Sequence, residues 1–350
     1  MKIGQRKIGI GHSPYVICEM SANHNGDLSK ALEIITKAAM TGADAVKLQT
    51  YRPDTITLDA NTPDFQIEGG LWDGRTLYDL YEEAHTPWDW HRPLFDHARK
   101  LGLTVFSSPF DTTAVDLLED LNAPAYKVAS FEVIDLPLIR YIAATGKPMI
   151  MSTGMADDVE IAEAVEAAHE GGCTELALLH CVSGYPAPAA DYNLATILDM
   201  AARFGLPVGL SDHTIDNTTA IASVALGASI IEKHFTLDRD GGGPDDSFSL
   251  EPAEFTALCT SVRTAWEAMG KVDYGRKPSE KANVKFRRSL YFVKDLAKGD
   301  VVTADAVRSV RPGYGLPPKH IDAVIGRRTA RDVVRNTACT EDALEGGIGR

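Results

Sequence analysis

Two short apolar runs in this sequence each end close to a histidine. Residues 209–214 read Gly-Leu-Ser-Asp-His-Thr, and residues 230–235 read Ile-Ile-Glu-Lys-His-Phe. Because a β-strand turns successive side chains to opposite faces, Glu232 and His234 share one face. If both runs belong to one parallel barrel, His213 and His234 can converge at its C-terminal mouth, where such barrels keep their chemistry. Either histidine alone is typical of an ordinary strand end, but two with a carboxylate predict a divalent-metal site.

Other apolar runs carry charged and hydroxyl side chains. Glu19 lies in one of them, where a buried carboxylate needs a partner, a ligand or a role in proton transfer. Lys47 and Lys127 lie in two more. One buried lysine could form a structural ion pair or a Schiff base, but two facing one lumen favour a shared anion. Hydroxyls at further run ends are Ser107, Ser108, Ser130, Ser152 and Ser211. Together these groups predict a phosphate pocket beside the metal pocket.

The elements that must position these side chains alternate along the chain. Short apolar runs are separated by amphipathic stretches of helical period, which predicts a parallel sheet. Eight runs over roughly 250 residues favour an α/β fold of the (β/α)8 or TIM-barrel type. The predicted strands are 15–20, 45–50, 103–108, 125–129, 148–153, 175–181, 207–211 and 229–235. Predicted helices include 28–40, 88–101, 113–121, 159–169 and 218–226.

The rest of the chain predicts additions to this barrel. The opening residues have isoleucines spaced around glycines, which indicates a β-hairpin that plugs the bottom of the barrel. Segments 51–81 and 237–250 are long loops, and such loops are usually functional. The β/α rhythm ends near residue 270. The predicted domains are a barrel (1–271, with the hairpin at 1–12), a polar linker (272–287) and a small C-terminal domain (288–350).

The overall composition limits the partners of this chain. A formal net charge of −14 argues against binding to nucleic acid or to a membrane, so a phosphate site must be a local basic cluster. The five cysteines are widely spaced and include no C-x-x-C pair, which is typical of reduced cytoplasmic thiols. Cys18 and Cys181 lie in apolar runs and are predicted to be buried for packing. No apolar leader or membrane-length stretch is present, so we expect a soluble cytoplasmic protein.

Several motifs, in order along nearly the whole chain, resemble the sialic acid synthase family. They are Glu19-x-x-x-Asn23-His24-Asn25-Gly26, Gly42-Ala43-Asp44-Ala45-Val46-Lys47-x-Gln49-Thr50, Ser152-Thr153-Gly154-Met155, Ser211-Asp212-His213-Thr214, Glu232-Lys233-His234-Phe235 and Gly243-Pro244-Asp245. This family condenses phosphoenolpyruvate with an amino sugar to make nonulosonic acids. The C-terminal segment is similar to the family's antifreeze-like (SAF) domain, through Lys298-Gly299-Asp300 and Val310-Arg311-Pro312-Gly313.

The resemblance also implies roles for individual residues. It implies that His213 and His234 hold Mn²⁺ or Mg²⁺, which polarises the aldehyde of the open-chain sugar. C3 of phosphoenolpyruvate attacks that carbon, water adds at C2, and phosphate leaves by C–O cleavage. Glu19 and Glu232 are the candidates for proton transfer, and Asn23, His24 and Asn25 shape the mouth. The residues implied to bind phosphoenolpyruvate are Lys47, Ser108, Lys127, Ser130, Ser152, Ser183, Tyr185 and Ser211.

The sugar pocket of the family implies a second set of residues. These are Gln49, Phe110, Asp245 and Arg311. In the family the SAF domain reaches across a domain-swapped homodimer, so Arg311 is expected to act catalytically in the partner's site. Without the resemblance, an arginine before Pro-Gly would be read as an ordinary turn residue.

Some segments are most similar to the pseudaminic acid branch of this family. They are Ser21-Ala22, Phe65-Gln66-Ile67-x-Gly69-Gly70-Leu71-Trp72-Asp73-Gly74-x-Thr76-Leu77-Tyr78, Thr86-Pro87-Trp88-x-Trp90-His91 and Arg311-Pro312-Gly313-Tyr314-Gly315-Leu316. The sialic acid branch usually has Gly in the first motif and Asn at position 183, which disfavours N-acetylmannosamine. The expected acceptor is 2,4-diacetamido-2,4,6-trideoxy-L-altrose, and the alternatives within the family are legionaminic and N-acetylneuraminic acid synthesis. Outside it, the alternatives are a Schiff-base class I aldolase and a non-catalytic barrel that binds sugar acids.

Overall fold

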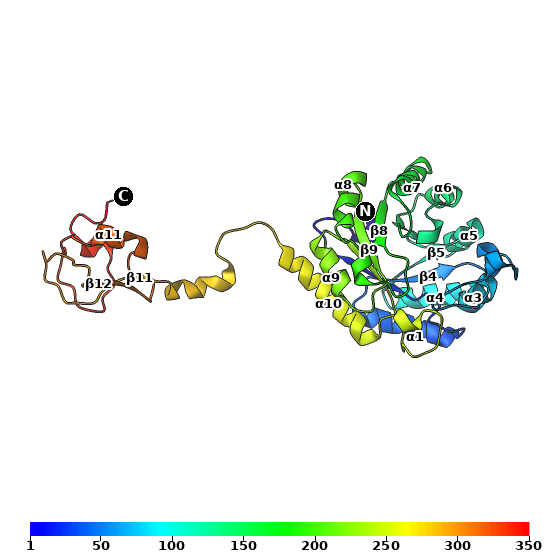
Figure 1. The fold of residues 1–350 in the computed structure, drawn as a ribbon, viewed down its shortest axis with the longest axis horizontal. Helices are drawn as coiled ribbons and strands as arrows, with labels where there is room; N and C mark the ends of the chain where they lie inside the picture. The colour runs from blue at the N-terminus through cyan, green and yellow to red at the C-terminus, as the bar shows by residue number, and fades with distance from the viewer. Residues whose placement is uncertain (350) are drawn as a thin grey trace. The chain divides into compact units, whose positions relative to one another are not determined.

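The computed structural model describes residues 1–349 and contains a closed barrel of eight parallel strands (Figure 1). The strands follow one another around the barrel in chain order, and the last one closes the ring by pairing with the first. This confirms the predicted TIM barrel. The strands are β3 (Tyr15–Glu19), β4 (Ala45–Thr50), β5 (Thr104–Pro109), β6 (Tyr126–Val128), β7 (Met149–Ser152), β8 (Leu176–Cys181), β9 (Val208–Asp212) and β10 (Ile230–His234).

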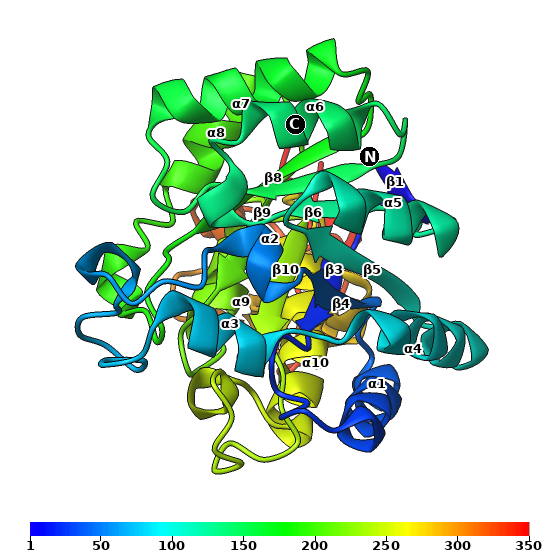
Figure 2. The same cartoon turned by 90° about the vertical axis from the view of Figure 1, so that its right-hand side faces the viewer.

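Helices surround the strands on the outside of the barrel (Figure 2). Asp27, Asp111 and Asp157 each cap one of them, because the carboxylate accepts backbone N–H groups of the first turn. Apolar helix faces pack on the outward residues of the strands to form the larger core. The helices are α1 (Leu28–Thr41), α4 (Trp88–Lys100), α5 (Thr112–Asp120), α6 (Leu136–Ala143), α7 (Asp158–Glu170), α8 (Thr196–Phe204), α9 (Thr218–Ala225) and α10 (Pro252–Met269).

The interior of the barrel is apolar at the bottom and polar at the top. The antiparallel pair β1 (Lys2–Ile3) and β2 (Arg6–Lys7) forms the predicted hairpin. Ile3 and Ile8 pack with inward-facing side chains of the strands, including Phe106, in a second core cluster. Since side chains alternate along a strand, the inward residues nearer the C-terminal ends lie above this plug. The hairpin thus fills the N-terminal end of the barrel interior, and the polar inward side chains lie toward the C-terminal end.

Two segments predicted to be irregular contain helices. The first, 51–81, contains α2 (Pro53–Ile56) and most of α3 (Leu77–Ala84), which Thr76 caps by accepting the N–H of Asp79. The second, the linker at 272–287, contains the 3-10 helix η5 (Pro278–Phe286). Neither segment has a long run of apolar residues at helical spacing. Their short helices instead begin at prolines or at residues that cap the first turn.

Residues Lys271–Arg350 form a compact unit separate from Met1–Gly270. The unit contains the antiparallel strands β11 (Ser289–Phe292) and β12 (Val307–Val310) and the short helix α11 (Ile321–Val324). These elements enclose an apolar core of their own. No helix within residues 1–349 has both the length and the apolar character needed to cross a membrane.

Candidate active site

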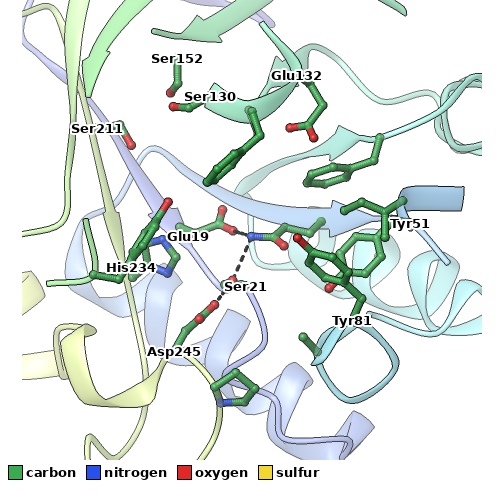
Figure 3. A pocket seen from close by; sticks show the side chains of 18 of the residues that line it. Glu19, Ser21, Tyr51, Tyr81, Ser130, Glu132, Ser152, Ser211, His234 and Asp245 are labelled. Atoms are coloured by element: carbon green, nitrogen blue, oxygen red, sulfur yellow. Dashed lines mark hydrogen bonds between the residues drawn. The ribbon is translucent and has the colours of Figure 1, made fainter. Parts of the chain in front are cut away.

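A cavity of about 370 Å³ opens at the C-terminal end of the barrel (Figure 3). Inward-facing side chains of the strands line it, together with the segments that follow β4, β6 and β10. The predicted site residues in its lining are Glu19, Lys47, Gln49, Phe110, Lys127, Ser130, Ser152, Tyr185, Ser211, His213, Glu232, His234 and Asp245. Barrel closure therefore brings together residues from distant parts of the chain.

Two lysines and two glutamates form a buried ion-pair cluster in this cavity. Lys47 Nζ lies 2.9 Å from Glu232 Oε1 and 3.3 Å from Glu19 Oε2. Lys127 Nζ lies 3.2 Å from the same oxygen of Glu232, to which Ser211 Oγ donates at 3.1 Å. The strand register explains the cluster, because Glu19 on β3 is aligned with Lys47 on β4. Each charge is therefore neutralised within the protein before any ligand binds.

Burial and neighbouring charges give these four groups different proton affinities. Burial raises the pKa of the Glu19 carboxyl above its ordinary value, although Lys47 opposes the change. Burial also acts on Glu232, but Lys127 and Lys47 outweigh it and hold the pKa of that carboxyl well below its ordinary value. Burial lowers the pKa of Lys127 to about 8. At neutral pH Glu232 is thus a carboxylate between two cations, and Glu19 is the carboxyl that more readily holds a proton.

His213 and His234 converge as the strand alternation predicts. Their ring centroids lie 5.4 Å apart. His213 Nδ1 donates to the carbonyl oxygen of Val182 at 2.8 Å, which leaves a lone pair on Nε2. His234 Nδ1 is buried and has no hydrogen-bond partner, and burial holds the pKa of this imidazole well below its ordinary value. Burial thus keeps the His234 ring neutral and able to bind a metal ion. Burial also acts on His213, but Cys181 outweighs it and raises the pKa of that imidazole, so a metal ion must displace a proton there.

These two histidines fit a divalent cation that takes oxygen atoms for its remaining ligands. Within residues 1–349, no group of three or more His, Cys, Asp or Glu side chains could hold a metal ion. A site with only two protein ligands keeps several positions for water or substrate, which a Lewis-acid role requires. Metal binding by His213 and His234 therefore stays a prediction, with which this donor set is compatible.

Hydroxyl groups gather near the C-terminal ends of β6 and β7. The hydroxyls of Ser152, Ser183 and Ser108 are buried and have no hydrogen-bond partner, whereas Ser130 Oγ accepts the N–H of Gly154 at 3.2 Å. A Cβ at position 154 would lie 2.4 Å from Ser183 Oγ and 2.8 Å from Ser130 Oγ, so this close approach requires glycine. Of these serines, Ser152 and Ser130 line the cavity together with Lys127, and their hydroxyls suit the oxygen atoms of an anion.

A chain of hydrogen bonds connects Glu19 to the loop after β10. Gln49 Nε2 donates to Glu19 Oε1 and to Ser21 Oγ, both at 2.9 Å, and Ser21 Oγ donates to Asp245 Oδ2 (Figure 3). Ser21 has a φ of 47°, a left-handed conformation that residues with a side chain rarely adopt. The surrounding contacts therefore hold this hydroxyl between Gln49 and Asp245 at a cost in backbone strain.

Asn23, His24 and Asn25 lie in the loop after β3. Asn23 Nδ2 donates to the carbonyl oxygen of Phe235 at 2.9 Å and to a serine hydroxyl at 2.8 Å. Asn25 Nδ2 donates to Asp246 Oδ2 at 3.0 Å. His24 is fully buried, and its ring packs edge-on against an indole. The two asparagine contacts tie the loop after β3 to the segment after β10, although none of the three residues lines the cavity, and their role in shaping its mouth stays a prediction.

The sequence patterns do not predict the apolar side of the cavity. We call this side the apolar wall, and it consists of Tyr51, Ile56, Ile67, Trp72, Leu77, Leu80, Tyr81, Ala84, Phe110 and Phe131. Of these, only Phe110 was expected in the site. Glu132 also lines the cavity and has a buried, unpaired Oε2, and burial raises the pKa of its carboxyl to about 7.

Cys181 is a second unpredicted residue of the lining. It is buried, as expected, but it also faces the cavity, with Sγ 4.0 Å from His213 Nδ1. Packing alone is therefore an incomplete description of this thiol. The signal that could have found it is the strand alternation, which places Cys181 on the same inward face as Leu179 of the barrel core.

Three predicted site residues lie outside the cavity lining. Ser108 is buried on β5, in register with Gln49, and Ser183 lies against Gly154. Arg311 directly follows β12 in the second unit and is exposed. The geometry of the barrel unit thus brings together the ionic, imidazole and hydroxyl groups but does not include the arginine.

Comparison with known proteins identifies the family. The NeuB family model matches residues 34–274, most of the barrel, and the SAF domain model matches residues 287–345. The chain belongs to the NeuB family. Its members are phosphoenolpyruvate-dependent nonulosonic acid synthases that generally use a divalent metal, and the C-terminal unit is a SAF domain. The family resemblance drawn from the motifs is therefore confirmed.

Similar proteins from three organisms cover nearly the whole chain. A pseudaminic acid synthase of Helicobacter pylori is 41% identical, over 95% of this chain and 98% of the relative. An N,N'-diacetyllegionaminic acid synthase of Campylobacter jejuni is 37% identical, over 89% of this chain and 94% of the relative. The crystal structure of an N-acetylneuraminic acid synthetase from Leptospira borgpetersenii, in complex with citrate, matches with a TM-score of 0.73 and 30% identity, over 81% of this chain and 94% of that one.

Proposed function

We propose that this member of the NeuB family is a pseudaminic acid synthase. It condenses phosphoenolpyruvate with 2,4-diacetamido-2,4,6-trideoxy-L-altrose and water, and it releases pseudaminic acid and phosphate. One observation carries the chemistry: the lysine–glutamate cluster and the histidine pair line the same cavity. The 41% identity to the Helicobacter pylori relative supports the choice of acceptor. Synthesis of legionaminic acid is the alternative, because a relative with that name is 37% identical.

Phosphoenolpyruvate binds with its anionic groups beside Lys47 and Lys127. The two ammonium groups act as point charges, and the hydroxyls of the lining serines, Ser130, Ser152 and Ser211, supply hydrogen bonds to the phosphate and carboxylate oxygens. Glu232 already holds both lysines in place through a single oxygen. The anion site is thus preorganised, which lowers the entropy cost of binding.

Glu19 and Glu232 take different parts in the reaction. The π electrons of phosphoenolpyruvate form the new bond from C3 to the aldehyde carbon, and Glu19, the carboxyl of higher pKa, gives its proton to the aldehyde oxygen. Glu232 stays ionised and stabilises the positive charge that develops at C2. Water then adds at C2 and returns a proton to Glu19. The C2 hydroxyl of the tetrahedral intermediate then becomes a carbonyl as the bond between C2 and the bridging oxygen breaks, and the hydroxyl proton leaves with the phosphate.

His213 and His234 would hold the divalent metal, Mn²⁺ or Mg²⁺. When bound, the metal supplies Lewis-acid polarisation of the sugar carbonyl. Val182 fixes His213 by accepting its Nδ1 proton, and burial keeps His234 neutral and ready to bind. The remaining contacts to the sugar come from Gln49, Asp245 and Phe110, and from Arg311 of a partner subunit in a domain-swapped homodimer.

Phosphate release from purified protein tests the proposed function. Phosphoenolpyruvate is offered with the L-altrose acceptor, with its legionaminic counterpart or with N-acetylmannosamine, each with Mn²⁺. We expect the highest kcat/KM with the L-altrose sugar, loss of activity in EDTA and recovery when Mn²⁺ is restored. Turnover only with N-acetylmannosamine would contradict the acceptor, and activity that survives EDTA would contradict the metal site.

A Schiff-base aldolase is the second candidate, because burial lowers the pKa of Lys127 to about 8 and so favours a neutral amine. Such an enzyme would be inactivated by borohydride in the presence of pyruvate, and its mass would increase by one reduced adduct. We expect no adduct, because Lys127 is ion-paired with Glu232 at 3.2 Å. A stable adduct on Lys127 would replace the synthase proposal with the aldolase.

A further inference from the structure

The part of the apolar wall around Tyr51 and Tyr81 lies across the cavity from His234 (Figure 3), whereas Trp72 packs against Tyr185 beside the histidines. Figure 3 shows Tyr51, Tyr81 and Glu132 on one side of the cavity, with Ser211 and His234 on the other. Carbon–carbon bond formation takes place between the anion site and the metal site. The aldehyde carbon of an open-chain sugar must therefore lie between these two sites. The far end of the sugar chain then extends toward another part of the cavity. The wall is the part of the lining that these reacting groups leave free.

Contacts on both sides hold the wall in a defined shape. Tyr51 packs edge-on against Phe110 and Tyr81, with ring centroids 5.1 Å and 5.7 Å apart. Trp72 Nε1 donates to the carbonyl oxygen of Pro244 at 3.1 Å, which links the wall to the loop that carries Asp245. Such an ordered apolar surface can discriminate between methyl groups and hydroxyl groups on a ligand.

Glu132 is the polar exception beside this surface. Its Oε2 is buried and has no hydrogen-bond partner, and its charge acts on the neighbouring Tyr81. An unpaired buried carboxyl oxygen is costly unless a ligand donates a hydrogen bond to it. The N–H of an acylamido group is a donor of this kind, and the methyl group beyond its carbonyl carbon suits the apolar side chains nearby.

We propose that residues 51–84, together with Glu132, form a subsite that recognises an acylamido group at C4 and a methyl group at C6 of the acceptor sugar. This inference rests on the proposed synthase function and adds the basis of its sugar selection. N-acetylmannosamine has hydroxyl groups at C4 and C6, and the aliphatic side chains of the wall, among them Ile56, Ile67 and Leu77, offer a C6 hydroxyl no partner for the hydrogen bonds that it makes in water. The subsite therefore selects diacetamido-trideoxy sugars as a class, in either the altro or the manno configuration.

Segment 51–84 also contains residues that mark the pseudaminic acid branch, and three of them face the cavity. Ile67, Trp72 and Leu77 lie in the stretch that most resembles that branch, and all three line the wall. The stretch of sequence that marks the pseudaminic acid branch thus forms part of the surface that would distinguish a diacetamido-trideoxy sugar from N-acetylmannosamine.

A matched pair of substitutions tests the wall. Ile56 lines the cavity, whereas Leu58, two residues later, is 64% exposed and outside the lining. We measure kcat/KM for the diacetamido-trideoxy sugar and for N-acetylmannosamine, and take their ratio. Ile56→Asn is expected to lower this ratio at least about tenfold, and Leu58→Asn to leave it unchanged. The KM for phosphoenolpyruvate should change in neither variant.

Glu132 is tested in parallel with variants that conserve or remove its oxygen. Glu132→Ala is expected to lower kcat/KM for the diacetamido-trideoxy sugar by about 10- to 100-fold, and Glu132→Gln by less, because the amide oxygen still accepts a hydrogen bond. Glutamine is nearly isosteric, so this variant stays informative if Ile56→Asn fails to fold. Equal losses in Ala and Gln would contradict the role of Glu132 as an acceptor.

The outcomes separate this inference from the proposed function. If the wild-type protein releases no phosphate with any of the sugars, the synthase proposal fails. If it turns over N-acetylmannosamine as well as the trideoxy sugar, or if Ile56→Asn leaves the ratio unchanged, the subsite proposal fails and the synthase proposal stands.

Discussion

Lys127 is an active-site residue whose charge changes just above physiological pH. Burial lowers the pKa of its ammonium group to about 8, although Glu232 lies 3.2 Å away. If the cation binds phosphoenolpyruvate, kcat/KM for this substrate should fall about tenfold per pH unit above pH 8, because this parameter reports the free enzyme. Initial rates of phosphate release between pH 6.5 and 10, at saturating sugar, measure the effect.

Two variants control this pH dependence. Lys127→Met should start from a low kcat/KM and show no further loss above pH 8. Lys147→Met removes a lysine whose ion pair with Glu119 lies outside the cavity, and it should keep the wild-type profile. A wild-type kcat/KM that stays constant up to pH 9.5 would contradict the assigned role.

The same pKa also affects the stability of the fold. Because the pKa of Lys127 in the folded protein lies below the ordinary lysine value of 10.5, the unfolded chain binds more protons between pH 8 and 10.5. The contribution of Lys127 to stability therefore rises across that window.

Ser21 combines backbone strain with a contact to the sugar side of the cavity. Ser21→Gly should raise the KM for the sugar about tenfold, because Gln49 and Asp245 lose the hydroxyl between them. It should leave stability nearly unchanged. Glycine adopts the φ of 47° without strain, a gain of roughly 1 kcal/mol that offsets a similar cost in chain entropy. Steady-state kinetics and thermal unfolding measure the two effects.

Ser21→Ala separates the two effects. Alanine also lacks the hydroxyl, so it should raise the KM for the sugar as glycine does, but it keeps the strained backbone and should not recover stability. A sugar KM that stays at the wild-type value in both variants would show that the hydrogen bonds of Ser21 do not position Gln49 or Asp245.

At the scale of elements, a buried ion pair ties together the two strands that carry the histidines. Lys233 Nζ on β10 lies 2.9 Å from Asp212 Oδ2 at the end of β9, and it also donates to the carbonyl oxygens of Thr214 and Asp216. Lys233 and Asp212 are each adjacent to one histidine in the sequence. The pair points away from the barrel lumen and therefore fixes the strand ends without touching the substrate.

Breaking this pair should cost both stability and metal affinity. Lys233→Met leaves the carboxylate of Asp212 buried and unpaired, which costs about 3–5 kcal/mol of unfolding free energy. Arg203→Met removes a surface pair with Asp158 and should cost less than about 1 kcal/mol. All four tryptophans lie in the barrel unit, so tryptophan fluorescence in denaturant reports its unfolding. Mn²⁺ binding to the folded variants is measured in parallel, and equal effects of the two substitutions would contradict the role of the pair.

The strands could be predicted from the sequence because a strand that is buried on both faces has apolar residues at most of its positions, and such a run is visible in the sequence. Once the barrel closes, alternation fixes which side chains face the lumen, so Glu19, Lys47 and Glu232 could be placed from sequence alone. The apolar wall could not, because its position depends on contacts between distant segments. Trp72 reaches the cavity through a bond to Pro244, 172 residues later. No periodic pattern around Trp72 or Glu132 indicates that contact.

At the scale of the whole molecule, the proposed residues are divided between two compact units. The barrel unit contains the ion-pair cluster and both histidines, and the SAF unit contains Arg311. Each unit has its own apolar core. The exposed Arg311 side chain is free to contact another surface. If the dimer is domain-swapped, each active site takes its barrel from one subunit and its arginine from the other.

Complementation between two inactive variants distinguishes arginine supplied by the partner from arginine supplied within one chain. Glu232→Gln disables the barrel, and Arg311→Ala disables the arginine. If Arg311 serves the partner's site, a heterodimer of the two variants contains one site with an intact barrel and an intact arginine. It should show about half the wild-type activity per dimer. If Arg311 serves its own barrel, every site in the heterodimer has a defect. Co-expression with two affinity tags isolates the heterodimer for phosphate-release assays, and activity no higher than that of the parent homodimers would exclude the exchange.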